Sequence, residues 1–261
     1  MRSLAVKLLK LTLICSLLPV SAYAYHLSDH RVITNKAVMV YNSCYPQDMF
    51  SALAAKRMVD GNLSEDFHLA NKWLKNSHYY NPTKWIRTLW RRDASYRMRE
   101  LLAKPKTTTM LGKILHFVQD MTSPTHVIPI VHGMFDGFES YEINIHSLYA
   151  AEVPCPLTVH SPQMIMKRHA LLTLRRIKAV AITERNGKPW VFSWQLFWSP
   201  GLGSSFGNYG FFGNRFGDSK PFTILGSTYV FKDETFHLFK LQQMLQAVSS
   251  SLAAMHWYRR G

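Results

Sequence analysis

The stretch from His116 to His126 constrains the fold of this chain more than any other part of its sequence. His116 and Asp120 lie four positions apart after the good helix formers of residues 110–115, so on a helix their side chains share one face. We expect Pro124 to end this helix and to leave His126 at its rim. Two metal-capable groups on one helix face, with a third just beyond, favour a metal site, although the same spacing also occurs in ordinary surface pairs.

The N-terminus has the pattern of an export signal. Basic residues come first, an apolar stretch follows over 11–20, and a small-residue cleavage pattern ends at Ala24. The apolar stretch is too short, and too clearly cleavable, for a membrane-spanning helix. We therefore expect residues 1–24 to be a signal peptide and residues 25–261 to be a single mature domain, in the periplasm or secreted from the cell.

Cysteine content and charge narrow the chemistry further. Cys15 would leave with the signal, so only Cys44 and Cys155 remain, and an oxidising compartment could join them if the fold brings them together. Without a cysteine cluster, a metal site must use histidine and carboxylate ligands. The formal net charge of +15 favours anionic partners such as phosphates, nucleic acid or acidic lipid surfaces, without choosing among them.

Helical periodicity dominates the first two thirds of the chain and returns at its C-terminal end. Between residues 186 and 231, glycine and aromatic residues take over, which is typical of an irregular hairpin or a long loop beside a functional cleft. We therefore predict an all-α, multi-helix single domain with one aromatic- and glycine-rich hairpin or loop excursion near 186–231. The expected helices cover residues 28–41, 46–61, 83–103, 108–121, 138–152, 161–182 and 233–258.

Further candidate metal ligands are spread along the first half of the mature chain. Tyr25 would be the new N-terminal residue, whose freed amino group and own carbonyl can chelate an ion. His132 and Asp136 form a second histidine–carboxylate pair four positions apart. The full candidate set is Tyr25, His30, Asp66, His78, His116, Asp120, His126, His132 and Asp136.

In order and central spacing, this set resembles the zinc-dependent bacterial phospholipases C and the fungal single-strand-specific zinc nucleases, which share a fold and a trinuclear zinc site. The resemblance covers the mature chain from Tyr25 to about Glu142. In that family an N-terminal tryptophan ligates zinc through its amino and carbonyl groups and a histidine follows closely, positions that Tyr25 and His30 match here.

The remaining motifs of the family follow in the same order. Its aspartate and its His-Phe-Tyr-Asp-Pro motif look like Asp66 and the His-Tyr-Tyr-Asn-Pro run that starts at His78. The helix motif His-x3-Asp-x5-His is similar to the stretch that begins at His116. The last pair of the family, a histidine and a carboxylate four positions apart, resembles His132 and Asp136.

Three departures from the family pattern are visible. Tyrosine replaces the N-terminal tryptophan, which matters little if only backbone atoms bind the ion. Asn81 replaces an aspartate at a position that we do not take as a ligand. The interval from His126 to the last pair is shorter than in the family, so Glu139 and Glu142 remain alternative carboxylates, and His146 an alternative to His132.

The resemblance implies a site for three Zn²⁺ ions and phosphodiester hydrolysis at it. Asp66 and Asp120 would be the catalytic carboxylates, with Asp120 as the bridge between two ions. The implied ligands are Asp66, His78, His116 and Asp120 for the first ion, Asp120, Tyr25 and His30 for the second, and His126, His132 and Asp136 for the third.

The substrate is the less constrained part of the expectation. The motif after His78 and the compact length look closer to the phospholipase C branch, which implies a monomer acting on a phospholipid membrane surface. The aromatic residues of 190–216 could touch that surface, although for most of them we favour packing against the helices. The alternative is a nuclease on single-stranded nucleic acid, with the arginines of 87–99 on phosphates. A non-catalytic metal-binding protein is the third possibility.

Overall fold

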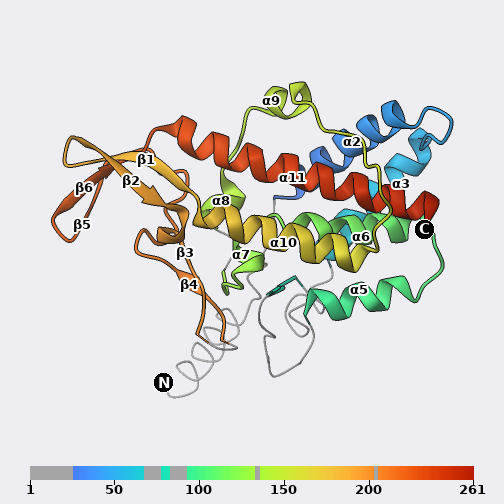
Figure 1. Ribbon diagram of the computed structural model, residues 1–261, viewed down its shortest axis with the longest axis horizontal. Coiled ribbons are helices and arrows are strands. Elements are labelled where there is room, and N and C mark those ends of the chain that lie inside the picture. Colours follow the sequence, from blue (N-terminus) through green and yellow to red (C-terminus); the bar gives the residue numbers. More distant parts are fainter. Residues whose placement is uncertain (1–25, 68–77, 83–92, 133–135, 203–204) are drawn as a thin grey trace, which may run out of the picture.

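The computed structural model describes residues 26–67, 78–82, 93–132, 136–202 and 205–261. Within these ranges the chain is mostly helical, with a small antiparallel sheet at one end of the helices (Figure 1). The expectation of an all-α fold is therefore corrected. The described helices are α2 (Leu27–Cys44), α3 (Ala52–Phe67), α5 (Ala94–Leu102), α6 (Thr108–Asp120), α7 (Pro124–Val127), α8 (Gly137–Ser140), α9 (Ile145–Ala150), α10 (Pro162–Lys178) and α11 (Asp233–Arg260).

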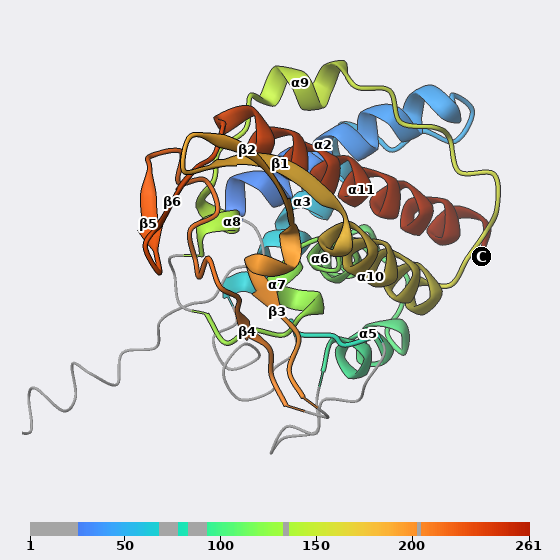
Figure 2. The same cartoon turned by 60° about the vertical axis from the view of Figure 1, so that its left-hand side comes forward.

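Helix α6 is the central element, and it packs against α3 on one side and against α10 and α11 on another (Figures 1 and 2). Its start is capped by Thr107, whose hydroxyl accepts a hydrogen bond from the backbone N–H of Met110 at 3.1 Å. Seven of its last eight residues before the C-cap are fully buried, polar side chains included. Those polar side chains include His116 and Asp120, so the helix carries its candidate ligands inside the protein.

Two glycines set how closely α3 and α6 approach each other. A Cβ atom added at Gly112 would lie 2.1 Å from the backbone oxygen of Met58, and one added at Gly61 would lie 2.2 Å from that of Thr109. The sequence predicted that Gly61 would end a helix over 46–61, and this was wrong, because the glycine serves the close contact instead. Helix α3 therefore runs on to Phe67 and carries Asp66 up to the end of α6.

Other boundaries differ for local reasons. The expected helix over 138–152 is divided into α8 and α9, and the expected helix over 161–182 ends at Lys178, where the first strand soon begins. The expected helix over 83–103 is described only from residue 93 onward, where Asp93 caps α5, and residues 83–92 lie outside the described ranges. The expected signal peptide and Tyr25 also lie outside them.

The excursion near 186–231 is a defined sheet with the strand order β2-β1-β6-β5. Its outward face carries exposed Val180, Ile182 and Val191, while the opposite face turns a large aromatic cluster toward α11. Trp194 contacts Phe239 of α11 with ring centroids 4.3 Å apart. The strands of this sheet are β1 (Val180–Arg185), β2 (Lys188–Ser193), β5 (Phe222–Ile224) and β6 (Ser227–Val230), and a separate pair is formed by β3 (Trp198–Ser199) and β4 (Asn208–Tyr209).

Burial decides the role of most aromatic side chains in this region. Trp194, Trp198, Phe212 and Phe216 are all buried in the core, so these rings stabilise the contact between the sheet and the helices rather than facing a lipid surface. Phe211 is the exposed member of the run, with 43% of its surface accessible.

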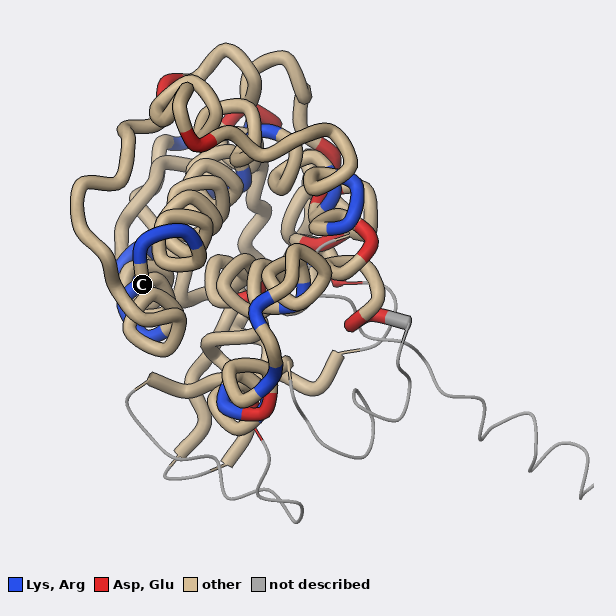
Figure 3. The backbone as a smooth tube through the Cα atoms, turned by 90° about the vertical axis from the view of Figure 1, so that its right-hand side faces the viewer, with Lys and Arg blue, Asp and Glu red and all other residues tan. Residues whose placement is uncertain are grey.

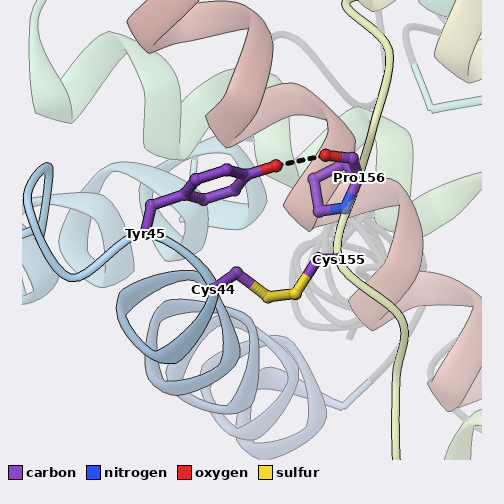
Figure 4. The surroundings of a disulfide bond; sticks show 4 residues. All are labelled: Cys44, Tyr45, Cys155 and Pro156. Atoms are coloured by element: carbon purple, nitrogen blue, oxygen red, sulfur yellow. Dashed lines mark hydrogen bonds between the residues drawn. A yellow bond between two sulfur atoms is a disulfide. The ribbon is translucent and has the colours of Figure 1, made fainter.

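A disulfide joins Cys44, at the end of α2, to Cys155, in the segment between α9 and α10 (Figure 4). Beside it the hydroxyl of Tyr45 donates a hydrogen bond to the backbone oxygen of Pro156. Disulfides persist in oxidising compartments, so this bond is consistent with an exported protein. None of the described helices is long and apolar enough to cross a membrane.

Candidate metal centre

Three groups of histidine and carboxylate side chains meet in the buried interior. Within each group the potential ligand atoms lie within 4.8 Å of one another, and every member is buried. The helices α2, α3, α6, α7 and α8 contribute members, together with the segments around His78 and His132. The groups are His30, His116 and Asp120; Asp66, His78 and His116; and His126, His132 and Glu139.

Asp120 lies between the first two groups. Its Oδ1 is 3.5 Å from Nε2 of His30. Its Oδ2 is 2.9 Å from Nδ1 of His78 and 3.4 Å from Nε2 of His116. The two oxygens of one carboxylate therefore face different histidines, and the helical spacing of His116 and Asp120 produces this arrangement on a single face of α6.

Asp66, on α3, faces His30 of α2 and His116 of α6. Its Oδ1 is 3.9 Å from Nε2 of His116, and its Oδ2 is 3.9 Å from Nε2 of His30. The preceding residue, Glu65, belongs to a different environment. Arg97 donates to both of its oxygens, at 2.9 and 3.1 Å, and Lys113 donates at 2.8 Å.

Burial alone would raise the pKa of the Glu65 carboxyl, but the hydrogen bonds from Arg97 and Lys113 outweigh it and hold that pKa below its usual value. The adjacent carboxylates Glu65 and Asp66 of α3 therefore have different partners. Glu65 ties α3 to α5 and α6 through a buried charge network, whereas Asp66 faces the histidines.

The third group contains Glu139 rather than Asp136. Oε1 of Glu139 lies 3.5 Å from Nε2 of His126 and 3.5 Å from Nε2 of His132. Asp136 instead caps α8, accepting the backbone N–H of Glu139 at 3.0 Å through Oδ1, while its Oδ2 accepts a hydrogen bond from the hydroxyl of Tyr209. The short Asp136 carboxylate at the N-cap is therefore engaged by the start of the helix. The longer side chain of Glu139, three residues later, reaches His126 and His132.

The other sequence-derived candidates lie elsewhere. Glu142 and His146 are exposed and belong to none of the three groups. Tyr25 lies outside the described residues, so the expected N-terminal ligand has no described position. The structure therefore brings together His30, Asp66, His78, His116, Asp120, His126 and His132 from the expected set, and adds Glu139, which the sequence left as an alternative.

The arrangement fits metal ions in two respects. Zinc–nitrogen and zinc–oxygen bonds of about 2.0–2.2 Å place tetrahedral ligands about 3.3 Å apart, and the separations around Asp120 lie on both sides of that value. Among the described residues, neither ring nitrogen of His132 has a hydrogen-bond partner, although both atoms are buried. Nitrogen and oxygen donors without thiolates suit a catalytic ion such as zinc.

Tyr79 forms one wall of the third group. Its ring stacks on that of His126 with centroids 5.4 Å apart and meets that of His132 edge-on. Burial, together with the charge of Glu139, raises the pKa of the Tyr79 hydroxyl well above its usual value, so this side chain stays neutral. Nδ1 of His126 lies 2.6 Å from the backbone oxygen of His78, which leaves Nε2 facing Glu139.

Sequence reasoning missed two residues that contact the candidate ligands. Asn62 lies 3.1 Å from Nδ1 of His116, and Gln119 lies 2.7 Å from Nδ1 of His30. The signal was present, because Asn62 precedes Asp66 by one helical turn and Gln119 follows His116 by three positions.

Comparison of the chain with protein-family models, with curated proteins and with solved structures finds no match.

Proposed function

We propose that this chain is an exported zinc-dependent phosphodiester hydrolase, and specifically a phospholipase C that releases diacylglycerol and a phosphorylated head group. The observation that carries the proposal is the position of Asp120, whose two oxygens face histidines of two different groups. A carboxylate placed in this way can be shared by two adjacent ions, as in the two-metal sites that stabilise both oxygens of an in-line displacement. The motif order, which resembles the zinc phospholipases C and zinc nucleases, supports the same reaction class.

The buried groups would hold three ions. Asp120 would be shared between the first and second ions, and Tyr25 would add its amino and carbonyl groups to the second. Bound zinc would supply a water of lowered pKa and an attractive charge for the phosphoryl oxygens. The expected ligands are Asp66, His78, His116 and Asp120; Tyr25, His30 and Asp120; and His126, His132 and Glu139.

The protein's own residues supply the surroundings that such chemistry needs. Asp66 and Asp120 bring carboxylates to the histidines in the buried interior, where electrostatic interactions are stronger than in solvent. Tyr79 covers His126 and, being neutral, adds no negative charge beside Glu139. Arg97 and Lys113 neutralise Glu65, which limits the negative charge at the end of α3.

The phospholipase-like motif after His78 supports a phospholipid substrate. The net charge, +15 for the full sequence and +12 without the three basic residues of 1–24 (15 − 3), suits a surface that carries phosphate groups. The same charge suits single-stranded nucleic acid, so the two substrates must be compared directly. We would incubate the purified mature protein with phosphatidylcholine vesicles and with single-stranded DNA, each with and without a chelator. Chelator-sensitive release of phosphorylated head group is the expected result, and turnover of DNA alone would overturn the phospholipase assignment.

Asp120→Asn is the variant that tests the site itself. Loss of the shared carboxylate should lower zinc content and reduce hydrolysis by at least about 100-fold, since even the outer partners of metal ligands are worth 10–100-fold. Asp60→Asn is the matched control, because Asp60 is an exposed residue on α3 that pairs only with Lys56 among the described side chains. Equal activity of the two variants would exclude Asp120 from the reaction.

The N-terminal ligand gives a separate prediction. One additional residue left before Tyr25 would move the α-amino group away from the site. We expect such a protein to retain less zinc and to hydrolyse its substrate more slowly than one that begins at Tyr25, measured by elemental analysis and by the vesicle assay. Full zinc content and full activity of the extended protein would remove Tyr25 from the ligand set.

A further inference from the structure

A fully buried network of neutral side chains lies behind two of the candidate ligands. Gln119 of α6 and Asn62 of α3 are both inaccessible to solvent, as are Thr34 of α2 and Ser251 of α11. Oε1 of Gln119 lies 2.7 Å from Nδ1 of His30. The network joins four helices immediately outside the ligands.

The two hydroxyl groups determine how the amide of Gln119 is oriented. Thr34 donates its only hydroxyl proton to the backbone oxygen of His30 at 2.8 Å, and Ser251 donates its own to that of Ala247 at 2.8 Å. Both hydroxyl oxygens can therefore only accept from Gln119, whose Nε2 lies 3.1 Å from one and 3.0 Å from the other. The Nε2 group must face the hydroxyls, so Oε1 must face His30.

Asn62 is oriented by the same proton count. Its Nδ2 donates one proton to Thr34 at 3.0 Å and the other to Oε1 of Gln119 at 3.0 Å. Its Oδ1 is left facing Nδ1 of His116 at 3.1 Å. Every proton of the two amides is used, so a flip of either amide would bring donor against donor or oxygen against oxygen.

The tautomers of both histidines follow from these orientations. An amide oxygen can only accept, so His30 and His116 must each carry a proton on Nδ1. In a neutral ring the other nitrogen, Nε2, then bears the lone pair. In both residues Nε2 faces Asp66 and Asp120, and in His116 it also lies 3.0 Å from Nδ1 of His78, from which a lone pair on Nε2 can accept.

We propose that Gln119 and Asn62 are positioning residues that hold His30 and His116 as Nδ1–H tautomers with Nε2 ready to bind an ion. This inference rests on the metal site of the proposed function and assigns the residues that prepare it. Neutral amides fix the rings as a carboxylate would, but they add no negative charge to a site that already contains Asp66 and Asp120.

The tautomers can be tested without a variant. Long-range ¹H–¹⁵N NMR spectra of the mature protein, labelled at histidine, distinguish a protonated Nδ1 from a protonated Nε2. We expect Nδ1–H forms with slow solvent exchange for His30 and His116, because both rings are buried. A protonated Nε2 on a neutral ring at either residue would overturn the proposal.

Zinc affinity supplies the second measurement. Gln119→Met and Asn62→Leu remove the acceptors while nearly preserving side-chain size, and each should weaken zinc binding about 10–100-fold in competition with a chromophoric chelator. Gln246→Met is the matched control. Gln246 is a buried glutamine that donates to the backbone oxygen of His169 and to Thr173, so its loss tests the general cost of a missing buried amide.

The outcomes separate this inference from the proposed function. Weaker zinc binding in the two variants but not in Gln246→Met supports it, even if the wild-type protein hydrolyses no phosphodiester. Unchanged zinc affinity in Gln119→Met and Asn62→Leu overturns it, even if the wild-type protein is an active phospholipase.

Discussion

Single residues in this protein are placed by local chemistry that their neighbours impose. The distinction between Asp136 and Glu139 is an example, since both are carboxylates within reach of His132 along the chain. The Asp136 side chain accepts hydrogen bonds from the backbone N–H of Glu139, in the first turn of α8, and from the hydroxyl of Tyr209, whereas Glu139 reaches the histidines. The spacing of four positions between His132 and Asp136 brings two side chains together only on a helix. Here the helix begins at Gly137, after both residues, so the spacing does not apply.

Leu225 provides a prediction at the residue scale. It lies at the tip of the β5–β6 hairpin with a φ of 49°, followed by Gly226 at 74°, and 89% of its side chain is exposed. The β1–β2 hairpin has the same turn geometry but uses Asn186 and Gly187, with φ values of 48° and 74°. Asparagine tolerates this left-handed region far better than leucine does.

We therefore expect Leu225→Asn to increase the free energy of unfolding by about 1 kcal/mol, measured by urea denaturation. The reciprocal variant, Asn186→Leu, should be destabilised by at least as much, because Asn186 also accepts the backbone N–H of Thr228 at 2.8 Å. A loss of stability in Leu225→Asn would show that the leucine side chain contributes more than its backbone strain costs.

At the scale of elements, the α3–α6 contact sets the distance between Asp66 and His116. Gly112→Ala would place a methyl group against the backbone of Met58, and a shift of either helix would move the candidate ligands that it carries. We expect this variant to lose about 1–3 kcal/mol of unfolding free energy, as overpacked cores do, and to bind zinc more weakly. Leu53→Ala, on the exposed side of α3, is the control that should change neither. Normal zinc binding in a destabilised Gly112→Ala protein would show that the close packing of α3 and α6 does not control the geometry of the metal site.

His169 is a buried residue of α10, and its backbone oxygen accepts a hydrogen bond from Gln246 of α11. This histidine gives a prediction on the pH dependence of stability. Burial, with the charges of Arg168 and Arg176, lowers the pKa of His169 from 6.5 to about 3. Below pH 6.5 the unfolded chain therefore binds a proton that the folded protein does not, so the free energy of unfolding falls as the pH falls toward 3. Each pH unit in that window costs up to about 1.4 kcal/mol.

His169→Phe removes the group whose protonation favours the unfolded chain. Its unfolding free energy should decline less steeply than that of the wild-type protein between pH 6.5 and pH 4.5, as measured by urea denaturation at each pH. Parallel profiles for the two proteins would mean that His169 does not contribute to acid sensitivity.

At the scale of the whole molecule, a disulfide and a set of ion pairs join segments that are far apart in the sequence. Arg259 and Arg260, at the end of α11, pair with Asp48 just after α2. Figure 3 shows basic positions, in blue, beside the C-terminus. The disulfide closes a loop with a sequence separation of 111 residues that includes α3, α5, α6 and the candidate ligands on α7 and α8. Closing a loop of this length restricts the unfolded chain strongly.

We expect the double variant Cys44→Ser, Cys155→Ser to lose about 2–5 kcal/mol of unfolding free energy. A reducing agent should lower the wild-type stability to the same level and leave the double variant unchanged, which makes the variant its own control. Equal urea midpoints for the oxidised wild-type protein and the double variant would show that the bond adds nothing to the stability.

What the sequence determined by itself is the part that depends on neighbours along the chain. The spacing of His116 and Asp120 on one helix and the helices near both ends of the described chain follow from local periodicity, and α2, α6 and α11 confirm them. The expectation for Pro124 was wrong, because α6 already ends at Asp120 and Pro124 is the first residue of α7, which contains His126. The resemblance also pointed to most of the residues that the structure gathers into three buried groups. These features need no knowledge of what lies across the core.

Only the tertiary structure decided the rest, because the deciding contacts are made between segments far apart in the sequence. Gly61 lies inside α3 since α6 approaches it, and the excursion is a sheet since its aromatic side chains pack on α11. Gln119 and Asn62 acquire a role only where His30 and His116 meet them across the bundle. Hydrogen bonds of this kind depend on positions to within a fraction of an ångström, which periodicity along one chain does not specify.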